Sequence, residues 1–191
     1  LTKNIKAALD RGVNPHEIAV LTRNRSHAKS VLQALMDASI PAYADLAEDV
    51  LEEPITEKLL ILLRAIHEYA DDEALFRAFH LDVFGLSPYE LYKLSQAASK
   101  KRKSLAELLA SVSLMEEIGI TQAARFHDLF TQLGHFYVLS HNESLNGVLH
   151  TIVRDSGFLR YMLKSKNPIL VTAPIRALFD QVQTLDKDHL W

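Results

Sequence analysis

The 191-residue chain contains no cysteine. It therefore forms no disulfide bond and no thiolate metal site, a composition typical of a reducing compartment, and we expect a cytoplasmic location. Glycine is scarce as well: there are six glycines, and none of them is followed by lysine. The phosphate-binding loop GxxxxGK[S/T] is thus absent, so we expect no ATP hydrolysis by this chain alone.

A strong charge of one sign and long apolar runs are missing too. The chain carries 21 basic and 24 acidic residues, a formal net charge of −3, so no overall positive field draws it to nucleic acid. Any contact with DNA must come from local basic clusters. No apolar run reaches the roughly 18 residues that cross a bilayer, so no membrane partner is expected.

The first 45 residues have a mixed α/β pattern. Ile18–Leu21 is an apolar run of strand length, and residues 26–35 follow it with the apolar spacing of a helix. Ile40–Tyr43 is a second candidate for a short strand. The pattern predicts a small α/β fragment with one or two strands.

The remainder of the chain has the pattern of helices. Pro54 precedes a run of leucines on helical spacing, and Asp71 or Asp72 is placed to begin the next helix. Ser87 and Ser104 are each followed three residues later by glutamate, the capping-box signature of a helix start. Five apolar residues follow the i, i+3, i+4, i+7 rule and predict one buried helix face: Phe126, Leu129, Phe130, Leu133 and Phe136.

The change in composition near Asp45 indicates one boundary. We therefore predict a mainly α protein in which residues 1–45 form the α/β fragment and residues 46–191 form a helical domain. We also expect a hinge near Asp45, because few contacts need to cross such a boundary.

Arg23, Arg25 and Lys29 form the first candidate site. A guanidinium group binds phosphate through several donors in a fixed fork, and side chains two residues apart in an extended segment point the same way. The pattern therefore predicts a contact with the phosphates of a nucleic-acid backbone. The alternative is a solvated rim whose charges pair with nearby acids.

Residues 18–29, which read IAVLTRNRSHAK, resemble the motif IAVLYRTNAQSR of the UvrD/Rep/PcrA family, the superfamily 1A DNA helicases. The likeness continues without gaps into Ala34-Leu35 and Ile40-Pro41. In that family the segment belongs to the second RecA-like motor domain, called 2A. The resemblance therefore implies that residues 1–45 are the end of a 2A domain and that residues 46–191 are a 2B-like accessory domain.

The same resemblance implies roles for the basic residues. Arg23 falls on the arginine with which the family contacts single-stranded DNA, Arg25 replaces a second contact residue, and Lys29 matches the final arginine of the motif. Thr22 stands where the family has tyrosine, so a stacking role for that ring is lost.

A second element of the family is the sequence GIG, which opens a helix of domain 2B and grips duplex DNA through main-chain amides. Gly85-Leu86-Ser87 falls at this position, with Ser87 in place of the last glycine, and Pro88 removes one amide donor. The resemblance implies a duplex contact at Gly85, Leu86 and Ser87. The alternative is a well-capped helix start without a role in binding.

The one dense basic run consists of Lys100, Lys101, Arg102 and Lys103. It lies at the end of the helix that Ser87 is expected to begin. Basic residues at this end of a helix complement its dipole, which is one interpretation of the run. The other is a contact with duplex phosphates, each of which adds to a salt-dependent affinity.

No metal site is predicted, because the nine histidines are scattered and form no ligand pattern. We expect no cofactor in this chain, with ATP and Mg²⁺ held elsewhere in a longer parent protein. The resulting hypothesis is a non-catalytic, DNA-engaging or regulatory segment of a UvrD/Rep-type helicase that unwinds DNA in repair, replication or recombination. The alternatives are a segment of a RecB/AddA-type helicase–nuclease and a helical protein-interaction module without a DNA role.

Overall fold

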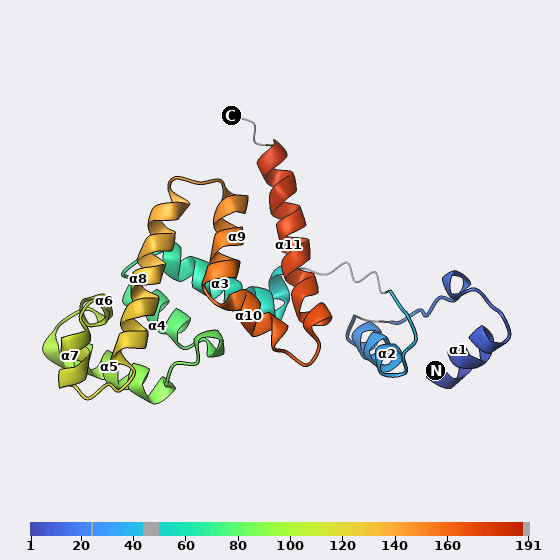
Figure 1. Ribbon diagram of the computed structural model, residues 1–191, viewed down its shortest axis with the longest axis horizontal. Coiled ribbons are helices and arrows are strands. Elements are labelled where there is room, and N and C mark those ends of the chain that lie inside the picture. Colours follow the sequence, from blue (N-terminus) through green and yellow to red (C-terminus); the bar gives the residue numbers. More distant parts are fainter. Residues whose placement is uncertain (24, 44–49, 189–191) are drawn as a thin grey trace. The chain divides into compact units, whose positions relative to one another are not determined.

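The computed structural model describes residues 1–23, 25–43 and 50–188, which form helices joined by turns. The chain divides into two compact units, Leu1–Glu48 and Asp49–Trp191, and each is described by itself. Figure 1 shows the elements of both units. The hinge expected near Asp45 lies outside the described residues, and the assignment of the two parts to 2A-like and 2B-like domains stays a prediction.

The first unit holds two α-helices within its described residues: α1 (Thr2–Asp10) and α2 (Arg25–Asp37). Between them lies a 3₁₀ turn, η1 (Pro15–Glu17), which begins where the Asn14 side chain accepts a hydrogen bond from the His16 amide. A small hydrophobic cluster holds the unit together, with three buried members: Ile5, Leu35 and Ile40.

The prediction of strands at Ile18–Leu21 and Ile40–Tyr43 is wrong: neither segment forms a strand, and the described residues contain none. The backbone at Ile18 is extended, with φ −103° and ψ 117°, but no second segment pairs with it in the described part of the chain. A strand needs a neighbour that accepts and donates its ladder hydrogen bonds. Without one, Leu21 is 95% exposed.

The second unit is helical in every described element, which confirms the prediction of a mainly α protein. Its elements are η2 (Val50–Glu52), α3 (Pro54–His67), α4 (Asp72–Phe79), η3 (Asp82–Phe84), α5 (Pro88–Lys101), α6 (Leu105–Leu109), α7 (Val112–Glu117), α8 (Ala123–Ser140), α9 (Leu145–Asp155), α10 (Phe158–Leu163) and α11 (Pro168–Asp188). Local signals begin several of them: Pro54 opens α3, Asp71 caps α4, and Ser104 forms the full capping box of α6.

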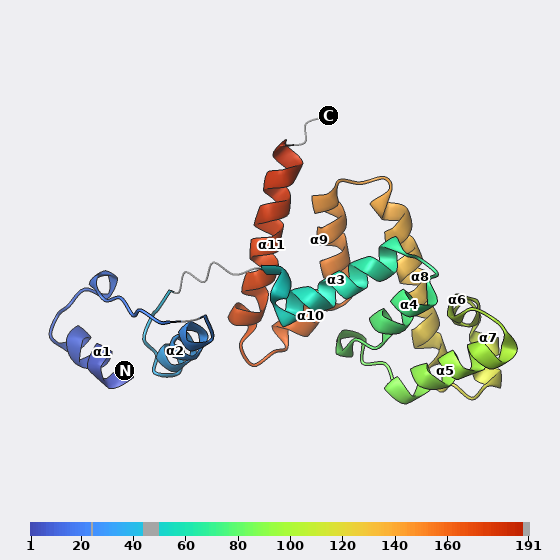
Figure 2. The same ribbon diagram turned by 180° about the vertical axis from the view of Figure 1, so that it is seen from behind.

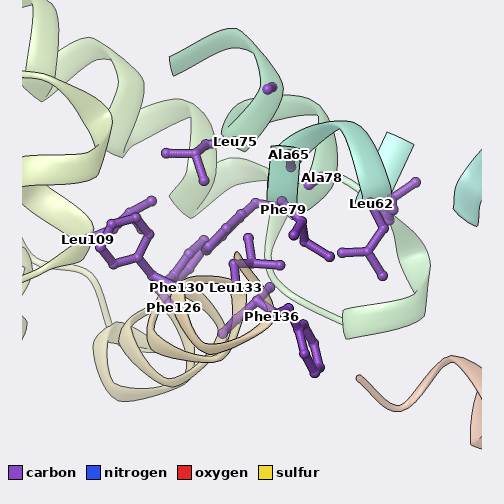
Figure 3. Packing of buried hydrophobic residues seen from close by; sticks show 14 of the residues in the cluster. Leu62, Ala65, Leu75, Ala78, Phe79, Leu109, Phe126, Phe130, Leu133 and Phe136 are labelled. Atoms are coloured by element: carbon purple, nitrogen blue, oxygen red, sulfur yellow. The ribbon is translucent and has the colours of Figure 1, made fainter. Parts of the chain in front are cut away.

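Helix α8 lies at the centre of the second unit's core. The five predicted residues of its inner face are all buried, which confirms that prediction. Phe126 stacks on Phe79 of α4, with 5.9 Å between the ring centroids. Figure 3 shows Phe79 close to Ala65 of α3, and Leu62 and Phe126 belong to the same buried cluster. One continuous apolar cluster thus joins α3, α4 and α8, and it fixes the positions of the turns that carry the candidate site.

Candidate nucleic-acid contacts

The basic residues of the first unit do not all lie in one extended segment. Arg23 is exposed just after the Ile18–Leu21 segment, whereas Arg25 is the first residue of α2. The rule that side chains two residues apart in an extended segment point the same way therefore does not apply to Arg23 and Arg25. The side chains of Arg25 and Lys29 lie outside what the structure describes, so their roles stay predictions.

The turn at Gly85 is fixed by an arginine from α8. Gly85 ends η3 in the left-handed region, with φ 57°, a conformation that glycine adopts at little cost. The Arg125 guanidinium donates hydrogen bonds to the Phe84 carbonyl at 2.8 Å and to the Gly85 carbonyl at 3.3 Å. No local pattern in the sequence indicates this contact, because Arg125 is 40 residues away from Gly85 along the chain.

Two helix starts cap each other next to this turn. The Ser87 hydroxyl accepts from the Glu90 amide at 3.4 Å, which confirms Ser87 as the N-cap of α5. The Glu90 side chain does not accept a hydrogen bond from the Ser87 amide, as it would in a capping box. Its carboxylate accepts from the amides of Thr121 and Gln122, each at 3.0 Å, just before α8 begins. The Gln122 side chain accepts from the Ser87 amide at 2.7 Å, and we call these four residues the reciprocal cap.

The reciprocal cap occupies two of the amides at this helix start. The Ser87 amide is bound to Gln122, the Glu90 amide is bound to Ser87, and Pro88 has no amide hydrogen. A phosphate bound to the Ser87 amide would therefore have to displace the Gln122 side chain. The duplex contact at Gly85, Leu86 and Ser87 stays a prediction, and the side chain of Leu86 packs against the hydrophobic core.

The Glu90 carboxylate is charged in its buried position. Burial alone would raise its pKa, but the hydrogen bonds from the Thr121 hydroxyl and from the Gln122 and Thr121 amides outweigh burial, so the pKa lies below its ordinary value. A negative charge at the start of α8 also complements the dipole of that helix. Glu90 therefore joins α5 to α8 by charge as well as by hydrogen bonds.

A second polar cluster holds the other side of the same loop. The Lys58 ammonium lies 2.7 Å from the Asp82 carboxylate and 2.7 Å from the Tyr161 hydroxyl, which itself donates to Asp82 at 2.9 Å. Burial alone would lower the pKa of Lys58, but the hydrogen bonds to Asp82 and Tyr161 raise it above the ordinary value. This cluster ties α3 and α10 to η3, so the Gly85 turn is held from both sides.

The basic run lies at the far end of α5 from the Gly85 turn. Lys100 and Lys101 form the last turn of the helix, and Arg102 follows in the left-handed region with φ 56°. The Lys103 amide donates to the Ala98 carbonyl at 3.0 Å, closing a Schellman turn. All four basic side chains are exposed, and no described carboxylate forms an ion pair with them.

The structure therefore does not bring the two predicted duplex contacts together. The 14 residues of α5 separate them, a length of about 20 Å at 1.5 Å per residue. A duplex that met both would have to run along the helix.

The described residues provide neither a cluster of metal ligands nor a membrane-spanning helix. Among the residues that the structure describes, no group of three or more His, Asp or Glu side chains is placed to hold a metal ion. None of the helices in the described part of the chain has the length and hydrophobicity that a bilayer crossing requires.

No protein-family model matches the chain, but relatives exist among curated proteins. The chain is 26% identical over 180 residues to an ATP-dependent helicase/nuclease subunit of Lacticaseibacillus casei (strain BL23). It is 27% identical over 193 residues to the exonuclease/helicase subunit RexA of Streptococcus pneumoniae (strain TIGR4). It is 25% identical over 187 residues to an ATP-dependent helicase/nuclease subunit of Heliobacterium modesticaldum (strain Ice1).

These alignments cover 92%, 97% and 94% of this chain but only 14%, 16% and 13% of the three relatives. The chain is therefore distantly similar to one segment of much longer proteins whose names combine a helicase with a nuclease. This result favours the helicase–nuclease alternative of the sequence analysis over the UvrD/Rep interpretation.

Proposed function

We propose that the chain is a DNA-engaging and regulatory segment of an ATP-dependent helicase–nuclease of the AddA type. The observation that carries this proposal is the similarity to helicase–nuclease subunits, which extends over more than nine-tenths of the chain in three bacterial genera. The shared segment does not hold the ATP-hydrolysing centre, because the chain contains no phosphate-binding loop. In the complete protein, ATP and Mg²⁺ are bound elsewhere.

The two parts of the chain have different roles in this proposal. Residues 1–45 act as the end of a 2A-like motor domain, and Arg23 contacts single-stranded DNA there, with Arg25 and Lys29. Residues 46–191 act as a 2B-like accessory domain that contacts duplex DNA or regulates unwinding by swivelling near Asp45. The exposed position of Arg23 supports this role, because its guanidinium is open to a phosphate. The cytoplasm is the expected location of such a protein.

Salt-dependent DNA binding by the whole chain tests the single-strand contact. Fluorescence anisotropy of a labelled oligothymidylate of about 20 nucleotides should show an affinity that falls linearly on a logarithmic salt scale. Arg23→Ala should reduce that slope by about one unit, since one phosphate contact is lost. Arg77→Ala is the matched control, because it removes one positive charge from α4, where Arg77 lies near Glu73.

A steep slope that Arg23→Ala lowers and Arg77→Ala does not would support the proposal. Binding that is absent, or that is equally sensitive to both variants, would instead leave the interaction-module alternative as the better account.

The basic run needs a test of its own, because its charges also complement the dipole of α5. Replacing Lys100, Lys101, Arg102 and Lys103 together with alanine should weaken duplex binding and reduce its salt slope by up to about four units. If the run serves only the helix dipole, the variant should lose thermal stability while its duplex affinity stays unchanged.

A further inference from the structure

The last three helices of the second unit form a cleft that the proposed function does not use. Helices α9, α10 and α11 lie side by side in both Figure 1 and Figure 2. Between them lies a cavity of about 530 Å³. Its apolar lining comes from all three helices: Val153, Leu159, Met162, Ile175 and Phe179.

The apolar surface continues out of the cleft. Leu163 lies one turn beyond Leu159 on α10 and is 57% exposed, and Ile169 lies one turn before the cleft residue Thr172 on α11 and is 72% exposed. Residues three and four apart share a helix face, so these side chains extend the lining to the surface. A contiguous apolar patch with polar neighbours marks an interaction site more often than an inert surface.

The charge around this cleft is opposite in sign to that of the whole chain. Residues 145–188, which include the three helices, contain six basic residues and four acidic ones, a net charge of +2, whereas the full chain carries −3. The structure describes the side chains of five of the basic residues: Arg154, Arg160, Lys164, Lys166 and Arg176. Arg154 is neutralised by Asp155, with which it makes two hydrogen bonds of 2.6 and 2.8 Å. No carboxylate that the structure describes forms an ion pair with the other four.

The interior of the cleft is poorly suited to a nucleobase. The His150 imidazole stacks on the Phe179 ring, with 4.3 Å between the centroids and 26° between the planes. A base would first have to displace His150 before it could stack on Phe179.

We propose that this cleft, bounded by α9, α10 and α11, docks an acidic amphipathic helix of a partner protein. The apolar face of that helix enters the cleft and covers Leu159, Leu163 and Ile169, as amphipathic helices do in hydrophobic grooves. Its flanking glutamates or aspartates face Arg160 and Arg176. A second copy that met this cleft with its own cleft would be a poor occupant, because the two basic surfaces would repel each other. The proposal does not depend on DNA binding.

NMR spectroscopy of the whole chain provides the test, with methyl and amide signals reporting where a probe binds. The first probe is a synthetic helix of about 16 residues with leucines at i, i+4, i+7 and i+11 and glutamates on the flanks. The second carries lysine in place of glutamate, and the third carries serine in place of leucine. An oligothymidylate is the fourth.

Two variants localise the effect, each with a matched control. Leu163→Ser should weaken binding of the acidic probe by about tenfold, whereas Val138→Ser, at a site on α8 that is 60% exposed, should leave it unchanged. Arg176→Glu should weaken the acidic probe and strengthen the lysine probe, whereas Arg77→Glu on α4 should change neither. These surface changes leave the buried core intact, so loss of folding does not confuse the result.

Saturable shifts of the Ile175 and Met162 methyl signals by the acidic probe, with the variant effects above, would support the proposal. Equal binding of the lysine probe would overturn the charge argument. Stronger binding of the oligothymidylate at the same methyl groups would assign the cleft to nucleic acid. Self-association that broadens these signals without a probe would assign it to a second copy, and no shift at millimolar probe would leave the cleft without this role.

Discussion

The two units of the chain differ in how much apolar surface they bury. In the first, the described buried cluster has three members, Ile5, Leu35 and Ile40. In the second, one continuous cluster runs from α3 to α11. The Ile18–Leu21 segment is as apolar as many helices of the second unit, yet Leu21 stands exposed. The difference shows that an apolar helical stripe finds its partners within this chain, whereas an extended apolar run needs a neighbouring strand that the described residues do not supply.

The largest expected effect lies in the centre of the second unit. Phe130→Ala should lower the free energy of unfolding by about 3 to 5 kcal/mol, because the ring is buried and its removal leaves a cavity. Ile5→Ala in the first unit should leave this main transition unchanged if the units unfold independently. Urea denaturation followed by circular dichroism measures both. Equal losses from Phe130→Ala and Ile5→Ala would show that the units unfold as one.

The reciprocal cap should give the next largest effect. Glu90→Gln should cost about 1 to 3 kcal/mol, because the amides of Thr121 and Gln122 lose a charged acceptor. The folded-state pKa of Glu90 lies below its ordinary value. The charge therefore stabilises the fold above the unfolded pKa of about 4.3, and this contribution is lost as the pH falls through the lower folded value.

The pH dependence of the unfolding free energy distinguishes the effect of the Glu90 charge from a simple loss of packing. Unfolding free energies measured between about pH 7 and pH 3 should fall less steeply for Glu90→Gln than for the natural chain. A parallel fall in the two proteins would mean that the carboxylate at position 90 is not the group whose titration matters.

A smaller effect is expected at Gly134 of α8, where the absence of a side chain leaves room for the Tyr69 ring. The Tyr69 ring is stacked with Phe130 and Tyr137, at centroid distances of 5.2 and 5.5 Å. A Cβ atom added at Gly134 of α8 would lie 2.8 Å from the Tyr69 hydroxyl, too close for either to stay in place. Gly134→Ala should therefore destabilise the chain by about 1 kcal/mol, despite the gain in helix propensity.

A double-mutant cycle isolates the contact. In a Tyr69→Phe background the hydroxyl is gone, so Gly134→Ala should cost less than it does in the natural chain. Thermal denaturation of the four proteins gives the coupling, and additive losses would place the strain elsewhere.

The sequence predicted what depends on neighbours a few residues away. Asp71 and Ser104 begin helices as expected, since their caps involve residues three positions further on. The prediction at Ser87 was half right: the cap forms, but the partner of its amide is Gln122, which only the folded chain brings near. The strand prediction at Ile18–Leu21 failed for the same physical reason, because strand formation depends on a distant partner. Arg125 and the Lys58 cluster were missed because their contacts are also remote in sequence.

The smallest effect in the isolated chain should come from Leu21, and it bears most directly on the contrast between the units. Leu21→Ser should change the stability of this chain by less than about 0.5 kcal/mol, because the side chain is already exposed. In the longer helicase–nuclease that we propose, we expect other parts of the protein to cover this apolar run, and the same substitution should then lower its thermal stability. Thermal denaturation of both proteins, with Tyr43→Ser as a second exposed site, makes the comparison. A Leu21→Ser effect that is equally small in the longer protein would show that the segment stays exposed there, and burial would then not explain the apolar character of this run.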